Sequence, residues 1–260
     1  MAKKANSKDE TWEMVFEQYK LLDHDFTKLP FHFDAGIFST LGVGNKKSGD
    51  GEARILCKHD SRAARPKIFR DNNLFILPTK NGKYALIQGE GYIDIEEILD
   101  DPIEYNSTLD FELLSSKIGD SEMQHLDFAY ATSLIRSHFD DPSLMLTIRG
   151  RKYTPELSFE VCGHKLDTAS VQTEVDAGYE GRDQIVLIEA KNSKTKDTII
   201  RQLYYPYRQW LQHTNKKIKT VFFEKQKNTG YYCIWNFAFS DPNNYNSIYL
   251  ENKARYKIIE

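Results

Sequence analysis

The chain has 260 residues, of which 40% are hydrophobic and 28% charged, and its formal net charge is −3. These values are typical of a soluble globular protein with one large or two small domains, and they exclude a uniformly basic nucleic-acid binder. We expect no contact with a membrane, because no apolar run approaches the ~18 residues of a spanning helix and the first residues lack the apolar core of a signal peptide. Three widely spaced cysteines indicate neither a disulfide framework nor a zinc site, so we expect a cytoplasmic protein.

The first secondary-structure elements predict a small α+β unit. Residues 10–22 carry apolar side chains on one side, which is typical of an amphipathic helix. Residues 74–78 and 83–88 are strand-like, and Asn81-Gly82 between them is a strong signal for a hairpin turn. We therefore expect a helix followed by a β-hairpin.

Two polar segments lie between that helix and that hairpin. Residues 42–51 are rich in glycine, lysine and serine, which predicts a loop; they lack the Gly-Lys-Ser/Thr ending of a phosphate-binding loop, so we expect no nucleotide cofactor. Residues 54–70 hold six basic residues against one acid. Arginine can grip a phosphate or a guanine edge through two hydrogen bonds, so this segment is either DNA-facing or a solvated connector. The candidates for DNA contact here are Arg62, Arg65, Lys67 and Arg70.

The rest of the chain follows an α/β order with a mixed sheet. A helix is predicted over residues 121–139, with serine at its start. Strands are expected near residues 144–148, 157–161, 169–176, 185–191, 218–224 and 231–239.

Two of these strands end in residues that can carry out metal-assisted chemistry. Glu174 and Asp176 share one face of the first strand, because side chains alternate along a strand. Glu189 and Lys191 end the next strand and again share a face. A hairpin of the two strands brings Asp176, Glu189 and Lys191 together, and Mg²⁺ accepts one or two carboxylates alongside phosphate oxygens. The alternative is that Glu-x-Lys is an ordinary ion pair on a solvated sheet edge.

A helix is predicted over residues 198–213. Its apolar stripe should face the sheet and consists of Ile199, Leu203, Tyr207 and Trp210. Pro206 lies inside this helix and is expected to kink or divide it. Arg201 and Arg208 follow the acidic strands, so both are candidates for phosphate contacts.

Residues 145–236 resemble the PD-(D/E)XK nuclease superfamily, especially its type II restriction endonucleases. Asp176 corresponds to the first acid of the motif, and Glu189-Ala-Lys191 to its (D/E)XK element. Val175 stands where the motif has proline, which weakens the match of the pattern more than that of the chemistry.

The resemblance implies a fold and a set of roles. The fold is a nuclease core, a mixed β-sheet flanked by helices over residues 116–260, preceded by a smaller α+β DNA-recognition domain over residues 1–115. Asp176 and Glu189 would bind Mg²⁺ with help from the Ala190 carbonyl, and Lys191 would serve the attacking water. Two further residues are implied in catalysis, Glu174 as an accessory acid and Gln202 on the following helix.

The function expected from these observations is that of a type II restriction endonuclease. Such an enzyme cuts double-stranded DNA at a specific sequence, leaves 5′-phosphate ends and acts as a homodimer on a palindromic site. Two alternatives stay open: a structure-selective repair or junction nuclease, and a DNA-binding protein whose nuclease core no longer cuts.

Overall fold

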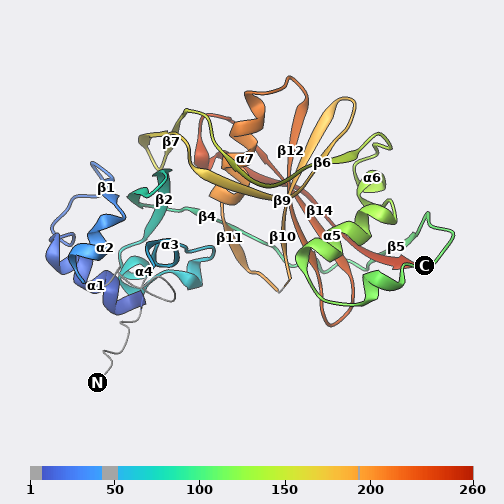
Figure 1. The fold of residues 1–260 in the computed structure, drawn as a ribbon, viewed down its shortest axis with the longest axis horizontal. Coiled ribbons are helices and arrows are strands. Elements are labelled where there is room, and N and C mark those ends of the chain that lie inside the picture. Colours follow the sequence, from blue (N-terminus) through green and yellow to red (C-terminus); the bar gives the residue numbers. More distant parts are fainter. Residues whose placement is uncertain (1–7, 43–51, 193, 260) are drawn as a thin grey trace.

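The computed structural model describes residues 8–42, 52–192 and 194–259. The expected loop over residues 42–51 lies, apart from its first residue, outside the described residues. In Figure 1 a small N-terminal part lies at the left of a large β-sheet, with the C-terminus at the far right. No described helix is long and apolar enough to cross a membrane.

The N-terminal part is a three-stranded antiparallel sheet covered by short helices. Its elements are α1 (Lys8–Gln18), β1 (Phe31–Asp34), α2 (Gly36–Thr40), α3 (Ala53–Leu56), η1 (Arg62–Ala64), α4 (Lys67–Asp71), β2 (Leu74–Lys80) and β3 (Lys83–Gln88). The strand order is β1-β3-β2. Trp12 of α1 is fully buried, and its ring lies 4.7 Å from that of Phe69 in α4. The predicted first helix and the hairpin around Asn81-Gly82 are confirmed.

The rest of the chain is built on one mixed sheet of seven strands. Their order in space is β5-β14-β13-β12-β10-β9-β6. The bounds are β5 (Ile103–Asn106), β6 (Met145–Tyr153), β9 (Gln172–Glu180), β10 (Gln184–Lys191), β12 (Lys217–Lys225), β13 (Tyr232–Phe239) and β14 (Ile248–Ile259). Strand β10 pairs antiparallel with β9 and parallel with β12, so the predicted α/β class with a mixed sheet is confirmed.

Helices cover both faces of this sheet. On one face α5 (Glu122–Ala131) and α6 (Leu134–His138) pack on Val186 and Ile188 of β10. On the other face α7 (Arg201–Leu211) covers Ile185 and Leu187 of the same strand. Alternate residues of β10 therefore face different layers. The remaining elements are β4 (Tyr92–Asp94), η2 (Leu114–Lys117), β7 (Leu157–Val161), β8 (His164–Thr168), β11 (Asp197–Ile199) and η3 (Tyr245–Ser247).

Several predicted bounds differ from the observed ones for identifiable reasons. The helix expected over residues 121–139 is divided at Ser133, whose φ of 65° breaks the helical path. The helix expected from residue 198 begins only at Arg201, because β11 pairs with β4. Pro206 lies in the interior of α7, which runs as one helix rather than being divided. Strands β8 and β14 were not predicted.

The boundary expected between residues 115 and 116 lies too late in the chain. Strand β5 pairs with β14 in the large sheet, and β4 pairs with β11, so residues 92–106 belong structurally with the second part. The two parts also share a core. Phe75 and Leu77 of β2 lie in one buried cluster with Leu203 and Tyr205 of α7. The hairpin is therefore packed against the helix that follows the acidic strands.

Candidate active site

The two acidic strands form the expected antiparallel pair. The recorded pairing of β9 with β10 runs to Ala177 opposite Ile188. Just beyond it, the Asp176 carboxylate accepts a hydrogen bond from the backbone N–H of Ala190, at 2.8 Å from Oδ2 to N. This bond holds the first acid beside the Glu-x-Lys element. In an extended strand the N–H and C=O of a residue point toward the same neighbour, so the Ala190 carbonyl faces the β9 side as well.

Asp176 lies in a bulge of β9. Gly150 of β6 lies opposite Val175 and Ile148 opposite Gly178, so β6 advances two residues while β9 advances three. An extra residue of this kind bends the strand and redirects a side chain, and bulges are frequent beside active sites. The bulge explains why Val175 packs under α7 while Ala177 packs under α5.

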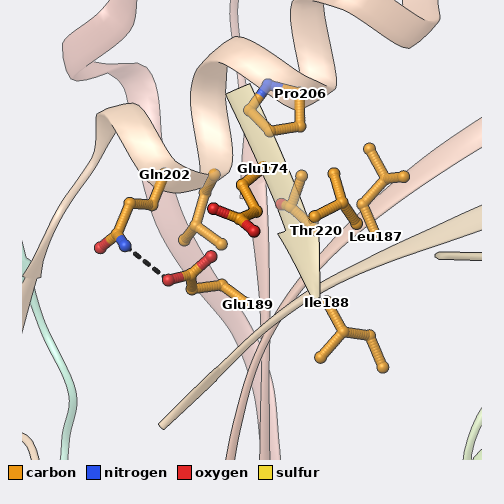
Figure 2. Close-up of a pocket in the computed structure, with 9 residues that line it drawn as sticks. Glu174, Leu187, Ile188, Glu189, Gln202, Pro206 and Thr220 are labelled. Atoms are coloured by element: carbon orange, nitrogen blue, oxygen red, sulfur yellow. Dashed lines mark hydrogen bonds between the residues drawn. The ribbon is translucent and has the colours of Figure 1, made fainter. Parts of the chain in front are cut away.

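Glu189 is the most enclosed carboxylate of the site. Its side chain is 9% exposed, and its Oε1 accepts hydrogen bonds from Lys191 Nζ and from Gln202 Nε2, the latter at 2.5 Å. Figure 2 shows Glu189 reaching toward Gln202 on the helix that covers the strand. Thr198 donates to the Gln202 Oε1 at 2.9 Å, which fixes the amide with its NH₂ toward Glu189. The predicted proximity of Asp176, Glu189 and Lys191 is thus observed, and Gln202 of the following helix contacts Glu189.

Burial shapes the electrostatics of these groups. Desolvation raises the pKa of Glu189 to about 7, and the nearby Asp176 charge adds to the rise while Lys191 opposes it. Desolvation likewise raises the pKa of Asp176. Burial works against the charge of Lys191, but the adjoining Glu189 carboxylate outweighs it and raises the lysine pKa. Two carboxylates that are costly to ionise share one cation, so a second cation beside them would favour their charged forms.

A small cavity lies behind Glu189, on the α7 side. It holds about 10 Å³, and apolar side chains such as Leu187, Ile188 and Pro206 line most of it (Figure 2). This volume is at the lower limit for one water molecule. It is too small for a substrate, which must approach from elsewhere.

The approach is a larger cleft of about 550 Å³ that reaches Asp176, Glu189 and Lys191. One side is formed by the core strands and α7. The other side comes from the N-terminal part, through the segment around Lys58 and the β2–β3 hairpin turn at Asn81. The active-site candidates therefore lie between the two parts of the chain.

Glu174 lies at the margin of this group. Its side chain is 55% exposed, and its Oε2 lies 3.5 Å from Nε of Arg151 on β6. Both residues line the cleft. Glu174 is therefore near enough to influence the site, without the enclosure of Glu189.

Of the residues predicted to contact DNA, only Arg201 lines the cleft. Arg62 forms ion pairs with Glu90 and Asp94, and Arg65 is 9% exposed and donates to the Leu74 carbonyl. These two arginines are occupied in holding the N-terminal part together and against the core. DNA recognition by Arg62 and Arg65 stays a prediction, and these internal contacts do not favour it.

The remaining three candidates also make internal contacts. Lys67 pairs with Asp71 one helical turn away, and Arg70 donates to the Arg65 carbonyl. Arg208 donates to the Pro242 carbonyl at 2.7 Å and to the Tyr204 hydroxyl at 2.9 Å. None of the three lines the cleft.

Other basic residues take their place at the cleft. They are Arg54, Lys58, Lys80 and Arg151. Arg54 and Lys58 belong to the basic segment recognised in the sequence, whereas the residues of that segment predicted to contact DNA lie farther along it. Lys80 precedes the Asn81-Gly82 turn, so the turn signal places it at a hairpin tip. Its place in the same cleft as Glu189 depends on how the hairpin packs on α7.

The donor set fits a divalent cation of the magnesium type. Within the described ranges, no group of three or more His, Cys, Asp or Glu side chains is arranged to hold a metal ion. The expected set has two carboxylates, Asp176 and Glu189, completed by a carbonyl oxygen. Magnesium commonly binds through one or two carboxylates and keeps several waters. The two carboxylates therefore provide the type of ligand atom and the negative charge that a magnesium ion needs.

Two protein families match this chain. Residues 87–257, which are 171 of the 260 residues, match the family described as "Domain of unknown function (DUF6997)". The chain belongs to this family. Residues 9–86 match a second model, "Domain of unknown function (DUF6996)". The two matches meet between residues 86 and 87, inside strand β3, and the DUF6997 segment contains Asp176, Glu189 and Lys191.

Comparisons with individual proteins add little. No curated protein matches. A solved structure described as "Crystal structure of SSO0001" is 14% identical with a TM-score of 0.20. That alignment covers 57% of this chain and 54% of the other, so the chain spans about half the length of that protein.

Proposed function

We propose that this DUF6997 protein is a Mg²⁺-dependent nuclease of the PD-(D/E)XK type that cuts double-stranded DNA. One observation carries the proposal. Asp176, Glu189 and Lys191 come from two adjacent strands and line the same cleft, and the two strands are tied together by the Asp176–Ala190 hydrogen bond. The same three residues correspond to the superfamily motif.

Asp176, Glu189 and the Ala190 carbonyl would hold the metal. When bound, Mg²⁺ supplies a Lewis acid for the phosphate oxygens and lowers the pKa of a bound water. The protein's own contribution is to fix the two carboxylates before the substrate arrives. Asp176 is held by the backbone of Ala190, and Glu189 by the amide of Gln202.

Lys191 has the position of a group that serves the attacking water. Its ammonium lies against Glu189, its side chain is 23% exposed, and it lines the cleft. A lysine ammonium in such a place can orient a water molecule and stabilise charge that develops on the phosphate in the transition state. Its raised pKa keeps it charged at neutral pH.

The finer assignment is to type II restriction endonucleases. It implies cleavage at a specific sequence, 5′-phosphate ends, and a homodimer, since one active site cuts one strand and a two-fold pair matches a palindromic duplex. Sedimentation with the cognate duplex in Ca²⁺ should give two chains per duplex. One chain per duplex with full double-strand cutting would contradict the dimer.

The decisive experiment is incubation of the protein with long duplex DNA and Mg²⁺. We expect discrete fragments, and no cutting when EDTA replaces the metal. Cleavage of branched but not linear DNA would favour the structure-selective nuclease instead. Binding without cleavage under all metal conditions would favour the non-cutting alternative, and robust cleavage in EDTA would reject the metal mechanism.

A further inference from the structure

We propose that the N-terminal part forms a wall of the active site and binds the phosphate backbone of the DNA strand being cut, through Arg54, Lys58 and Lys80, with Arg151 on the facing strand. This inference rests on the proposed nuclease function and assigns a role to the segment matched by DUF6996. It differs from recognition by Arg62, Arg65 and Arg70.

The first observation is that this wall is fixed to the core. The backbone N–H of Arg62 donates to Asp197 Oδ1 at 2.6 Å, and the N–H of Ile199 donates to the Asp60 carbonyl at 3.0 Å. On the hairpin side, the buried Tyr205 of α7 donates through its hydroxyl to the Pro78 carbonyl at 2.9 Å. These bonds lie beside the cleft-lining residues Lys58 and Lys80, so the cations are held at a defined place relative to Glu189.

The second observation is the distribution of charge within the cleft. Its six cations are Arg54, Lys58, Lys80, Arg151, Lys191 and Arg201, and its five carboxylates are Asp60, Glu122, Glu174, Asp176 and Glu189. The enclosed carboxylates lie on the core side, whereas three of the exposed cations come from the N-terminal wall. A DNA strand offers a row of phosphates, so a cationic wall beside a carboxylate pair can hold flanking phosphates while one phosphate meets the metal ligands.

The third observation is that these cations are available for a ligand. Arg54 and Lys58 have side-chain exposures of 77% and 65%, and each pairs with one half-buried acid, Glu52 and Asp60 respectively, whose side chains are 28% and 27% exposed. An ion pair whose cation is largely in water contributes little to stability, and Asp60 keeps a second cation, Arg201, at 3.8 Å when Lys58 turns to a phosphate. Lys80 is exposed, and it forms no ion pair within the part of the chain that the structure describes.

The two lysines of this wall favour contacts that do not depend on base sequence, and Arg54 can grip a phosphate through two hydrogen bonds. A lysine ammonium is a point charge without the planar fork that reads a guanine edge. We therefore infer that the N-terminal wall contributes affinity and position, and that loss of one cation weakens binding to all duplexes alike.

The test measures duplex binding by the full-length protein in Ca²⁺ across a salt series, using a fluorescent DNA. Arg54→Ala, Lys58→Ala and Lys80→Ala should each lower the slope of log K against log [salt] by about one, for any duplex sequence. Lys83→Ala is the matched control, because Lys83 is an exposed lysine of the same hairpin that does not line the cleft. Its slope should equal that of the wild type.

The outcomes separate this inference from the nuclease proposal. If the wild type binds and cuts DNA while all three variants keep the wild-type slope, the wall has no phosphate contacts and the inference is rejected, but the nuclease stands. If the folded wild type neither binds nor cuts DNA, both are rejected. Charge reversal gives a stronger contrast. Lys80→Glu should lower the affinity for DNA much more than Lys83→Glu does, and an equal loss of affinity in the two variants would contradict a specific contact by Lys80.

Discussion

Asp176 on β9 is joined to Ala190 on β10 by a carboxylate-to-backbone hydrogen bond of 2.8 Å. This bond links the first acid to the residue between Glu189 and Lys191. It forms where β9 bulges, so a local irregularity of the strand places the acid over the end of its neighbour. The geometry of the candidate site is therefore a property of the hairpin backbone as much as of the side chains.

Two substitutions at Asp176 should separate folding from chemistry. In Asp176→Asn the amide oxygen can still accept the Ala190 bond, whereas Asp176→Ala leaves that N–H without its acceptor. We expect both variants to cut DNA slower by about 10³-fold or more, because groups that act as one unit each cost orders of magnitude in rate. Asp176→Ala should also be less stable than Asp176→Asn, by about 1–3 kcal/mol. Cleavage assays and denaturant unfolding check the two claims, and near wild-type cutting by Asp176→Asn would contradict the assignment.

Gln202 should act through Glu189. We expect Gln202→Ala to slow cleavage, and Thr198→Val to slow it less, because the threonine only anchors the Gln202 amide. In the Gln202→Ala background, Thr198→Val should have little further effect, which a double-mutant cycle measures. Gln209→Ala is the control on the same helix: Gln209 does not line the cleft, and its loss breaks a bond to Thr173, so the variant should lower stability but not the rate per folded molecule. Strictly additive rate effects of Thr198→Val and Gln202→Ala would show that Thr198 does not act through Gln202.

Metal binding should be visible without any activity assay. Mg²⁺ that binds only the folded protein raises both the free energy of unfolding and the unfolding temperature. The free energy rises by about 2.7 kcal/mol when the Mg²⁺ concentration is a hundred times the dissociation constant. The shift should vanish in Asp176→Asn combined with Glu189→Gln, and should persist in Glu174→Gln, because Glu174 is exposed and paired with Arg151. Ca²⁺ should support DNA binding but not cutting, since its looser coordination positions the water poorly. An equal Mg²⁺ shift in the double variant would place the metal elsewhere.

Much of the core of this site was predictable from local sequence. The alternation along β9 and the continuous apolar run of β10 correctly predicted two neighbouring strands, and with them the meeting of Asp176, Glu189 and Lys191. The burial of Glu189 was not predictable, because it depends on α7 and on Gln202 thirteen residues later. The roles of Arg62 and Arg65 were unpredictable for the same reason: their partners Asp94 and the Leu74 carbonyl are set by packing, not by spacing.

The domain boundary shows a different limit. Strands β4 and β5 are short and come early in the chain, yet they pair with β11 and with the last strand, β14. No local pattern indicates partners more than a hundred residues away. Exposed residues such as Ile103 on the edge strand β5 also give it a weak hydrophobic pattern.

Stability should respond to pH through His138. This histidine is half-buried between Tyr256 and Asn236, where its Nδ1 lies 2.8 Å from the tyrosine hydroxyl and its Nε2 accepts from the asparagine amide at 2.9 Å. Burial lowers its pKa from 6.5 to about 4. Between these values the unfolded chain binds the proton and the folded protein does not, so stability falls as the pH falls. The loss from His138 should be about 2 kcal/mol between pH 7 and pH 5.

The measurement compares the free energy of unfolding of the wild type and His138→Gln at pH 7 and pH 5. Glu189 contributes with the opposite sign, because its raised pKa makes the folded state the better proton binder between 4.5 and about 7. The difference between the two proteins isolates the histidine. We expect the variant to lose less stability on acidification than the wild type, and an identical loss would show that His138 does not carry this dependence.

The central claim is that Lys191 completes a metal-dependent cutting site with Asp176 and Glu189. Its most direct test is the single-turnover cleavage rate of duplex DNA in Mg²⁺ for the wild type and Lys191→Ala, with the dissociation constant of each measured in Ca²⁺. We predict that the wild type cuts, and that Lys191→Ala binds the duplex with similar affinity but cuts it at least about 10³-fold slower. Cleavage by Lys191→Ala at close to the wild-type rate would contradict the account.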